Sequence, residues 1–333
     1  MMRRADPAEF DDKLRDAADV PAPYRPPMIR IMMNRGDWLT LLALAAIWGG
    51  AFFFISVAVR EVAPLTYVWA RLSIAAMALW LFLWWRGTSV GLPRSVWGAI
   101  IVLTLFNNVI PFILFGWGQT QIASGLAAIL NATTPIWGVV VAHLFTRDER
   151  MTPRKIGGVL IGFAGVAVLI GPALLGSLGK NVLAQLACVT ASLCYALAGV
   201  WARRFKAMQL SPMAVSTGQL TAGAAVMLPL ALLVDRPWGA TMPSFGAIAS
   251  IVALALVCTS FAYVLYFRLI DSAGATNALL VTLLVPPVAI LLGALFLGEL
   301  IRPRDMAGMA LIAVGLAAID GRILNLVRPP ATA

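Results

Sequence analysis

Ten apolar segments, each close to the length of a membrane-spanning helix, follow one another along this chain. A helix that crosses the hydrocarbon core of a bilayer needs about 20 mostly apolar residues. The segments begin near Leu39, Leu65, Val96, Ala123, Ile156, Val182, Met213, Phe245, Ala273 and Met306. They end near Ala58, Trp85, Trp117, Phe145, Gly171, Trp201, Val234, Phe267, Gly298 and Ile319. The loops between them are short, so we expect no inserted soluble domain.

The composition fits lipid rather than water as the solvent. Hydrophobic residues make up 61% of the 333 residues and charged ones only 12%, whereas soluble domains are about half apolar and about a quarter charged. The net charge of +10 would suggest nucleic-acid binding in a soluble chain. Here the basic residues gather in loops, so we expect the lipid bilayer as a partner and no nucleic acid.

Lysine and arginine are distributed unevenly between the two sides of the predicted membrane. Cytoplasmic loops are enriched in both residues. If the N-terminus is cytoplasmic, only five of the 25 basic residues face outward. These are Arg60, Lys180, Arg236, Arg302 and Arg304. We therefore predict a bacterial-type inner-membrane protein with both termini in the cytoplasm, a disordered leader over residues 1–36 and a short tail over residues 322–333.

The second half of the chain repeats the first. A shift of 150 positions aligns identical residues around the ends of the fourth and ninth segments. The aligned pairs include Glu149 and Glu299, Pro153 and Pro303, Arg154 and Arg304, Gly158 and Gly308, Gly165 and Gly315, and Gly171 and Gly321. A shift of 148 positions also pairs Pro64 with Pro212 and places Arg71 opposite Gln219.

This repeat predicts an all-α membrane protein with ten transmembrane helices in two five-helix repeats, residues 37–171 and 181–321. Because each repeat has an odd number of spans, the second repeat begins on the other side of the membrane and is inverted. Inverted repeats with a substrate site near the midplane are a recurring plan of secondary transporters. A structural membrane protein has no obvious need for this symmetry.

At this point the chain resembles the drug/metabolite transporter superfamily, specifically a tandem EamA-domain carrier. The motifs that carry the resemblance are Trp48-Gly49-Gly50, Pro64 with Arg71, Pro212 with Gln219, Gly125 with Pro135, Gly274 with Pro286, Leu297-Gly298-Glu299, and Gly308 with Gly315. The resemblance implies a ten-helix fold and transport of metabolites, most often export of amino acids and related compounds. The chain departs from the family pattern at two places. Arg147-Asp148-Glu149 stands where a Leu-Gly-Glu type ending is usual, and the second repeat has Tyr195 where the first has Trp48.

The third segment carries a group of polar side chains at membrane depth. Thr104, Asn107 and Asn108 fall largely on one helical face. Pro111 removes the backbone hydrogen bond to the carbonyl of Asn107 and leaves an acceptor beside the amides. These residues predict a hydrogen-bonding wall of a cavity. The alternative is that the amides bond to neighbouring helices.

Two further segments contain the same combination of proline and polar side chain. Pro135 frees the carbonyl of Asn131 beside Thr134, and Pro286 frees the carbonyl of Thr282. Matched, proline-interrupted spans in the two halves point to a transporter's binding site. A plain kink without a ligand is the alternative, because proline is tolerated in membrane helices.

One cation and several aromatic rings complete the candidate site. Arg71 lies about two turns into the second segment, where its guanidinium could meet a substrate carboxylate, extend to the membrane surface or bond a helix end. Trp48, Tyr195, Tyr263 and Tyr266 are the aromatic candidates for enclosing a substrate. For each ring, packing or interfacial anchoring is an equally good interpretation.

Acidic and metal-binding groups are scarce in the segments. No Asp or Glu lies at the centre of a span, so proton coupling would need tyrosine, Arg71 or the substrate itself. For Glu149 and Glu299, at segment ends, capping is the better interpretation. The sequence has one histidine, His143, and three cysteines, all in apolar segments. We therefore expect no metal, no cofactor and no disulfide framework.

Three classes of membrane protein compete at this stage. An intramembrane enzyme needs a nucleophile with its base, paired carboxylates or a metal cluster, and a channel needs a polar pore lining. Neither pattern occurs, so the sequence favours a secondary carrier that works by alternating access. The resemblance implies export of amino acids or related metabolites, with drugs, sugars or nucleosides as alternative substrates. The predicted substrate contacts are Trp48, Arg71, Asn107, Asn108, Asn131, Thr134, Tyr263 and Thr282, and the predicted gating breaks are Pro111, Pro135 and Pro286.

Overall fold

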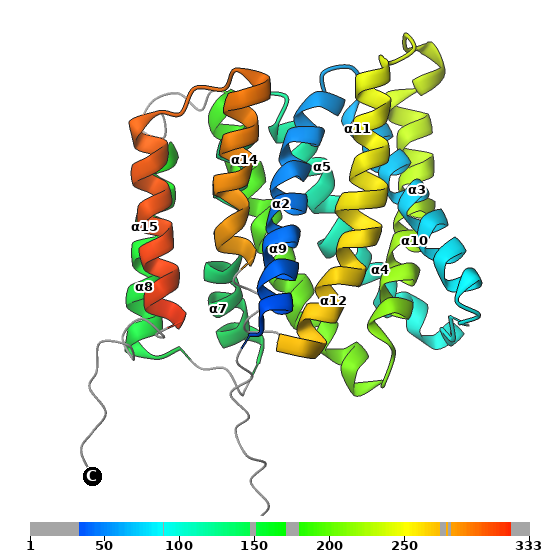
Figure 1. The fold of residues 1–333 in the computed structure, drawn as a ribbon, viewed down its shortest axis with the longest axis horizontal. Helices are drawn as coiled ribbons and strands as arrows, with labels where there is room; N and C mark the ends of the chain where they lie inside the picture. Colours follow the sequence, from blue (N-terminus) through cyan, green and yellow to red (C-terminus); the bar gives the residue numbers. More distant parts are fainter. Residues whose placement is uncertain are drawn as a thin grey trace, which may run out of the picture. The chain divides into compact units, whose positions relative to one another are not determined.

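The computed structural model describes residues 33–88, 90–146, 151–170, 180–273, 278 and 281–320. Within these residues the chain is helical and contains no strand (Figure 1). The helices of the first half are α2 (Arg35–Ala58), α3 (Pro64–Trp85), α4 (Trp97–Thr104), α5 (Ile110–Gly118), α6 (Ser124–Asn131), α7 (Thr134–Phe145) and α8 (Pro153–Ile170). Those of the second half are α9 (Lys180–Ala207), α10 (Pro212–Leu230), α11 (Phe245–Ala255), α12 (Ala262–Ala273), α14 (Val281–Leu297) and α15 (Pro303–Asp320).

Several sequence expectations concern residues outside this description. They are the leader up to residue 32, the tail over residues 322–333, the Arg147-Asp148-Glu149 ending, Gly171, Gly274 and Gly321. The first helix begins at Arg35, before the expected start, because Asn34 and Asp37 cap it reciprocally. Asp37 N–H donates to Asn34 Oδ1 at 2.9 Å, and Asn34 N–H donates to Asp37 Oδ2 at 3.0 Å.

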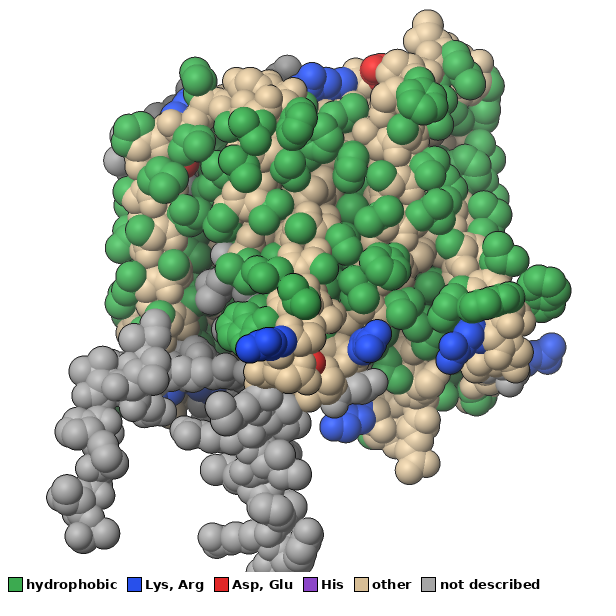
Figure 2. Space-filling model, in the orientation of Figure 1, with side chains coloured by type: hydrophobic (Ala, Val, Ile, Leu, Met, Phe, Trp, Pro, Cys, Tyr) green, Lys and Arg blue, Asp and Glu red, His purple; other side chains and the backbone are tan. Residues whose placement is uncertain are grey.

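The chain is a multi-pass membrane protein. Among the described residues, seven helical stretches are long and apolar enough to cross a bilayer. They are Arg35–Ala58, Pro64–Trp85, Arg94–Gly118, Ser124–Phe145, Asn181–Ala207, Pro212–Asp235 and Phe245–Ile270. Figure 2 shows hydrophobic side chains over the middle of one face, while most visible lysines and arginines lie along its lower edge. This distribution matches a lipid-facing belt beside a basic membrane surface.

Helices α8 and α15 lie side by side through their glycines (Figure 1). A Cβ on Gly158 would lie 2.7 Å from the carbonyl oxygen of Gly315, and one on Gly165 would lie 2.8 Å from that of Gly308. Gly162 also touches Gly315 through its backbone. The order of these contacts makes the two helices antiparallel, and their backbones approach as closely as only glycine permits.

Two helices have local irregularities beside Pro111 and Pro135. A π-helical segment, η3 (Leu105–Val109), precedes Pro111, which is a common site for such a distortion. Helix α6 ends at Asn131 and α7 starts at Thr134, so the span is interrupted beside Pro135. Pro135 has no N–H to donate to the carbonyl of Asn131. This carbonyl instead accepts a hydrogen bond from the Thr134 hydroxyl at 2.7 Å.

The third proline expected to break a helix does not do so. Helix α14 continues through Pro286 and Pro287, because proline in a membrane helix can kink the backbone without ending it. A second π-helical segment, η7 (Leu256–Phe261), joins α11 to α12 without any proline. The Thr259 and Ser260 hydroxyls donate to carbonyls five residues back, at 2.7 and 3.0 Å.

Three carboxylates each contact the beginning of a helix in the other half of the chain. Asp235 accepts the Thr66 N–H at 2.7 Å near the start of α3, and Glu61 accepts the Ser244 N–H at 2.6 Å before α11. Glu299 accepts the N–H groups at the start of α6 from Ser124 and Gly125. Negative groups stabilise helix N-termini. The expected capping role of Glu299 therefore holds, although it caps α6 rather than its own junction.

The contact of Glu61 should make part of the stability depend on pH. The backbone N–H of Ser244, followed by its hydroxyl, lowers the pKa of Glu61 below its usual 4.5. The stabilisation is therefore present above pH 4.5 and is lost as the pH falls through the lowered pKa. We expect Glu61→Ala to reduce the unfolding temperature slightly at neutral pH and to match the wild type in acid. A difference that is the same at every pH would contradict this assignment.

Candidate functional site

A buried arginine lies between three helices. Arg71 of α3 is only 5% exposed. Its Nε donates to Thr259 Oγ1 in η7 at 3.0 Å, and its Cζ lies 3.8 Å from the centre of the Phe112 ring in α5. The Thr259 hydroxyl can accept this bond because its own proton is donated to the carbonyl of Leu254. The widened turn of η7 thus presents a hydroxyl to the cation.

In the described part of the chain, no carboxylate forms an ion pair with Arg71. The ion pair found there joins Arg304 to Asp305. A buried charge without a partner is costly, and the Phe112 ring offsets only part of that cost. An ionisable residue buried within a membrane protein is a candidate for a functional site. The arrangement can bind an anion.

A polar side chain with one unpaired atom lies one helical turn from these contacts. Asn108 is fully buried, and its Nδ2 donates to the Tyr263 hydroxyl oxygen at 3.3 Å. Its Oδ1 has no hydrogen-bond partner. Asn108 precedes Phe112 by four residues and Tyr263 follows Thr259 by four, so this pair lies beside Arg71. The cluster of Arg71, Asn108 and Tyr263, which we call the central cluster, therefore offers a cation and a free acceptor.

Asn107, the neighbouring amide, faces a different helix. Its Nδ2 donates to Gln219 Oε1 in α10 at 3.0 Å, and Thr104 donates its hydroxyl to the backbone oxygen of Gln219 at 3.0 Å. These bonds link α4 and η3 to α10. For Asn107 the structure therefore displays the interhelical bonding that was the alternative interpretation of its sequence.

The aromatic candidates form a packed group beside the central cluster. The rings of Trp48 and Tyr266 lie 5.3 Å apart, and Phe115 stacks on Tyr195 at 6.1 Å. Tyr195 packs against two separate clusters of buried apolar residues. Such surfaces can enclose an apolar side chain.

The remaining predicted residues belong to α6, α7 and α14. Asn131 and Thr134 bond each other at the interruption between α6 and α7, and Thr282 is half-buried in the first turn of α14. Thr259 and Phe112 contact Arg71, but neither was among the sequence candidates. The adjacent hydroxyl residues Thr259 and Ser260 were the signal in the sequence from which η7 could have been predicted.

Comparison with known proteins identifies the chain. The model of the EamA-like transporter family matches it twice, over residues 35–171 and 182–319. The chain belongs to the EamA-like transporter family. The two tandem matches confirm the resemblance to drug/metabolite transporters that the sequence motifs indicated.

This EamA-like transporter has relatives in several bacteria. It is 24% identical over 290 residues to the uncharacterized transporter YoaV of Bacillus subtilis, covering 87% of this chain and 96% of that protein. It is 26% identical over 303 residues to a probable terminal-alkyne amino-acid exporter of Streptantibioticus cattleyicolor, covering 90% and 98%. It is 26% identical over 290 residues to the uncharacterized inner membrane transporter YedA of Escherichia coli, covering 87% and 92%.

A solved crystal structure supports the fold of this EamA-like transporter. It aligns with a TM-score of 0.63 and 20% sequence identity, covering 89% of this chain and 100% of the other. At this identity the likeness concerns the fold alone.

Proposed function

We propose that this EamA-like transporter exports amino acids with apolar side chains across a bacterial inner membrane by alternating access. The observation that carries the proposal is the central cluster, where a buried cation without a counterion lies beside an unpaired amide oxygen. An α-amino acid carries a carboxylate and an ammonium group on one carbon, and so presents an anion and a hydrogen-bond donor close together. Each charged end would replace a partner that the protein lacks.

The contacts suggest a role for each residue of the central cluster. The guanidinium of Arg71 would bind the substrate carboxylate, since arginine recognises carboxylates with two donors. Asn108 Oδ1 would accept a hydrogen bond from the ammonium group, with the Tyr263 hydroxyl holding the amide in place. The rings near Trp48 and Tyr195 would surround the apolar side chain. The relative named as an amino-acid exporter supports this substrate class.

The number of spans in the proposal is ten. Helices α8 and α15 have 18 residues each and α14 has 17. At about 1.5 Å per residue they reach roughly 26 Å, which nearly equals the hydrocarbon thickness of about 30 Å. Adding these three to the seven longer stretches completes two repeats of five.

Two sets of contacts support the inverted relation of the repeats. The contact of Gly158 with Gly315 becomes that of Gly308 with Gly165 when the repeats are exchanged. Similarly, the bond between α3 and η7, from Arg71 to Thr259, corresponds to the bond between α10 and η3, from Asn107 to Gln219. A two-fold axis in the membrane plane, with the substrate near it, is the arrangement expected of such carriers.

A route from the cytoplasm is suggested by a pocket of about 590 Å³ between the start of α10 and the end of α12, lined by Met213, Phe267 and Arg268 among others. The Phe267 ring lies 6.2 Å from that of Tyr263. The pocket therefore adjoins the central cluster. With both termini cytoplasmic, it would be the entrance for an exported substrate, and rocking at η3, η7 and the Pro135 interruption would open the other side.

Counterflow into proteoliposomes tests the proposal. Liposomes containing the full-length protein and unlabelled solute would be diluted into labelled amino acids, sugars, nucleosides or cationic drugs. We expect saturable exchange of L-leucine and other apolar amino acids, and none in protein-free liposomes. Exchange of another class, with none of any amino acid, would overturn the substrate assignment while leaving the carrier fold.

A further inference from the structure

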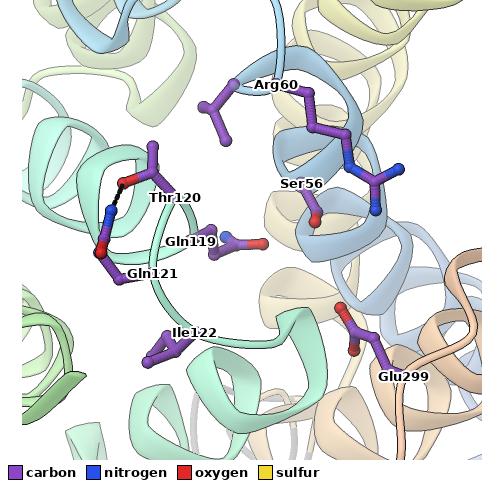
Figure 3. A pocket seen from close by; sticks show the side chains of 8 residues that line it. Ser56, Arg60, Gln119, Thr120, Gln121, Ile122 and Glu299 are labelled. Carbon is purple, nitrogen blue, oxygen red and sulfur yellow. Dashed lines mark hydrogen bonds between the residues drawn. The ribbon is translucent and has the colours of Figure 1, made fainter.

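A polar pocket lies at the other end of the helices from the entrance described above. Its volume is about 400 Å³, within the range of about 300–1,000 Å³ typical of small-molecule sites. Its lining comes from the end of α2, the loop after α5 and the turn after α14. The residues are Ser56, Val59, Arg60, Gln119, Thr120, Gln121, Ile122 and Glu299 (Figure 3). We call this space the outer pocket.

Gln119 is the unusual member of the outer pocket. Its side chain extends into the space between Ser56 and Glu299 (Figure 3). The residue is only 6% exposed, yet neither Oε1 nor Nε2 has a hydrogen-bond partner. Buried polar groups are nearly always paired, and an unpaired one is destabilising. Gln119 therefore offers one donor and one acceptor to a molecule that enters the pocket.

Glu299 is held in place by the end of α14. Gly298 adopts a φ of +66°, a conformation that favours glycine, and Glu299 N–H donates to the carbonyl of Gly293 at 3.1 Å. A Cβ on Gly293 would overlap the Glu299 carboxylate, so only glycine leaves room for it. Ser124 and Gly125 donate three hydrogen bonds to the carboxylate. One of its roughly four acceptor positions remains for a ligand.

Arg60 supplies the opposite charge. Figure 3 shows its guanidinium at the edge of the outer pocket, beside Ser56. Within the described residues no ion pair joins Arg60 to Glu299. The pocket therefore keeps a cation and an anion apart, and the unpaired amide of Gln119 points toward the space between Ser56 and Glu299.

We propose that the outer pocket is a second binding site for the zwitterion of an α-amino acid. The zwitterion occupies this pocket after it leaves the central cluster. The ammonium group contacts Glu299 and Gln119 Oε1, and the carboxylate contacts Arg60 and Gln119 Nε2. This inference rests on the proposed function for its substrate class. It adds a second site on the exit side, with its own residues.

The first test is the transport asymmetry of Gln119→Leu. L-leucine exchange would be measured with substrate added to right-side-out and to inside-out membrane vesicles. We expect the KM for external leucine to rise about 10-fold, because hydrogen bonds to charged groups are lost, and the KM from the cytoplasmic side to change less than about 2-fold. Thr241→Val is the control, since Thr241 is an exposed residue of the loop before α11 and is not among the residues that line the outer pocket.

A binding measurement separates this inference from the proposed function. In the Arg71→Leu protein, which lacks the central cation, L-leucine should still raise the unfolding temperature. Adding Gln119→Leu should remove that shift, and adding Thr241→Val should not. We also expect weaker shifts with 4-methylpentanoate and 3-methylbutylamine, which are leucine without its amino or its carboxyl group.

The outcomes are distinct. If wild-type protein does not exchange amino acids but the leucine shift depends on Gln119, the proposed function fails and the outer pocket stands. If exchange is normal and Gln119→Leu is folded with an unchanged external KM, the pocket holds water only and the inference is wrong. Because Gln119 is unpaired, its leucine variant should be at least as stable as the wild type, so misfolding does not obscure the result.

Discussion

Replacing Arg71 with leucine is expected to abolish amino-acid exchange while leaving a protein at least as stable as the wild type. Transport should fall by about 100-fold or more in kcat/KM, because the substrate carboxylate loses a charged, two-donor partner. Stability should not fall, since leucine removes a buried charge that has no counterion. A purely structural arginine would give the opposite pattern, with a loss of both folding and transport.

Two further substitutions serve as controls for Arg71→Leu. One keeps a positive charge at position 71, and the other removes a different arginine. Arg71→Lys keeps the charge without the planar fork, so we expect partial activity with a raised KM. Arg86→Leu removes an exposed arginine just after α3 and should leave exchange unchanged. The readouts are initial rates of L-leucine counterflow and unfolding temperature in detergent. Normal kinetics in a folded Arg71→Leu protein would exclude a carboxylate contact.

Substituting Gly315 should produce the largest loss of stability among the changes considered. A Cβ there would lie 2.6 Å from the Gly158 carbonyl oxygen and 2.7 Å from the Gly162 nitrogen. Both atoms belong to the backbone, so α8 and α15 must separate to admit a methyl group. We expect Gly315→Ala to cost about 1–3 kcal/mol of stability, the range for overpacked cores, and Gly315→Leu to prevent recovery of folded protein.

Gly157 provides the matched control in the same helix pair. A Cβ on Gly157 would meet nothing within 4 Å. Alanine is a better helix former than glycine by about 1 kcal/mol, so Gly157→Ala should be neutral or stabilising. Opposite signs at Gly157 and Gly315, followed as unfolding temperatures and as monodisperse protein in size-exclusion chromatography, would confirm backbone contact. Equal effects at the two positions would refute it.

Much of the helical arrangement could be predicted from the sequence because apolar length and proline position are local signals. Pro64, Pro153, Pro212 and Pro303 each occupy the first position of a helix, where a missing N–H costs nothing. The helix break predicted at Pro286 is not seen, because α14 continues through this proline. Whether a proline ends a helix or only kinks it depends on the helices packed against it, and that packing has no signature in a short segment.

The candidate site was predictable where a polar group in an apolar segment has few ways to be satisfied. Arg71 and Asn108 came from this argument and Tyr263 came from the aromatic candidates, and the structure brings the three together. Thr259 was not predicted, since hydroxyl residues in membrane helices usually bond their own backbone. Only the π-helical turn, which no proline marks, gives its oxygen a second partner.

The carboxylate caps that connect the two halves have a consequence for biosynthesis. Translation delivers Ser124 175 residues before Glu299, and Thr66 169 residues before Asp235. The starts of α6 and α3 therefore lack these caps until the corresponding part of the second half of the chain has been made. A chain stopped between the repeats would leave both helix ends unpaired.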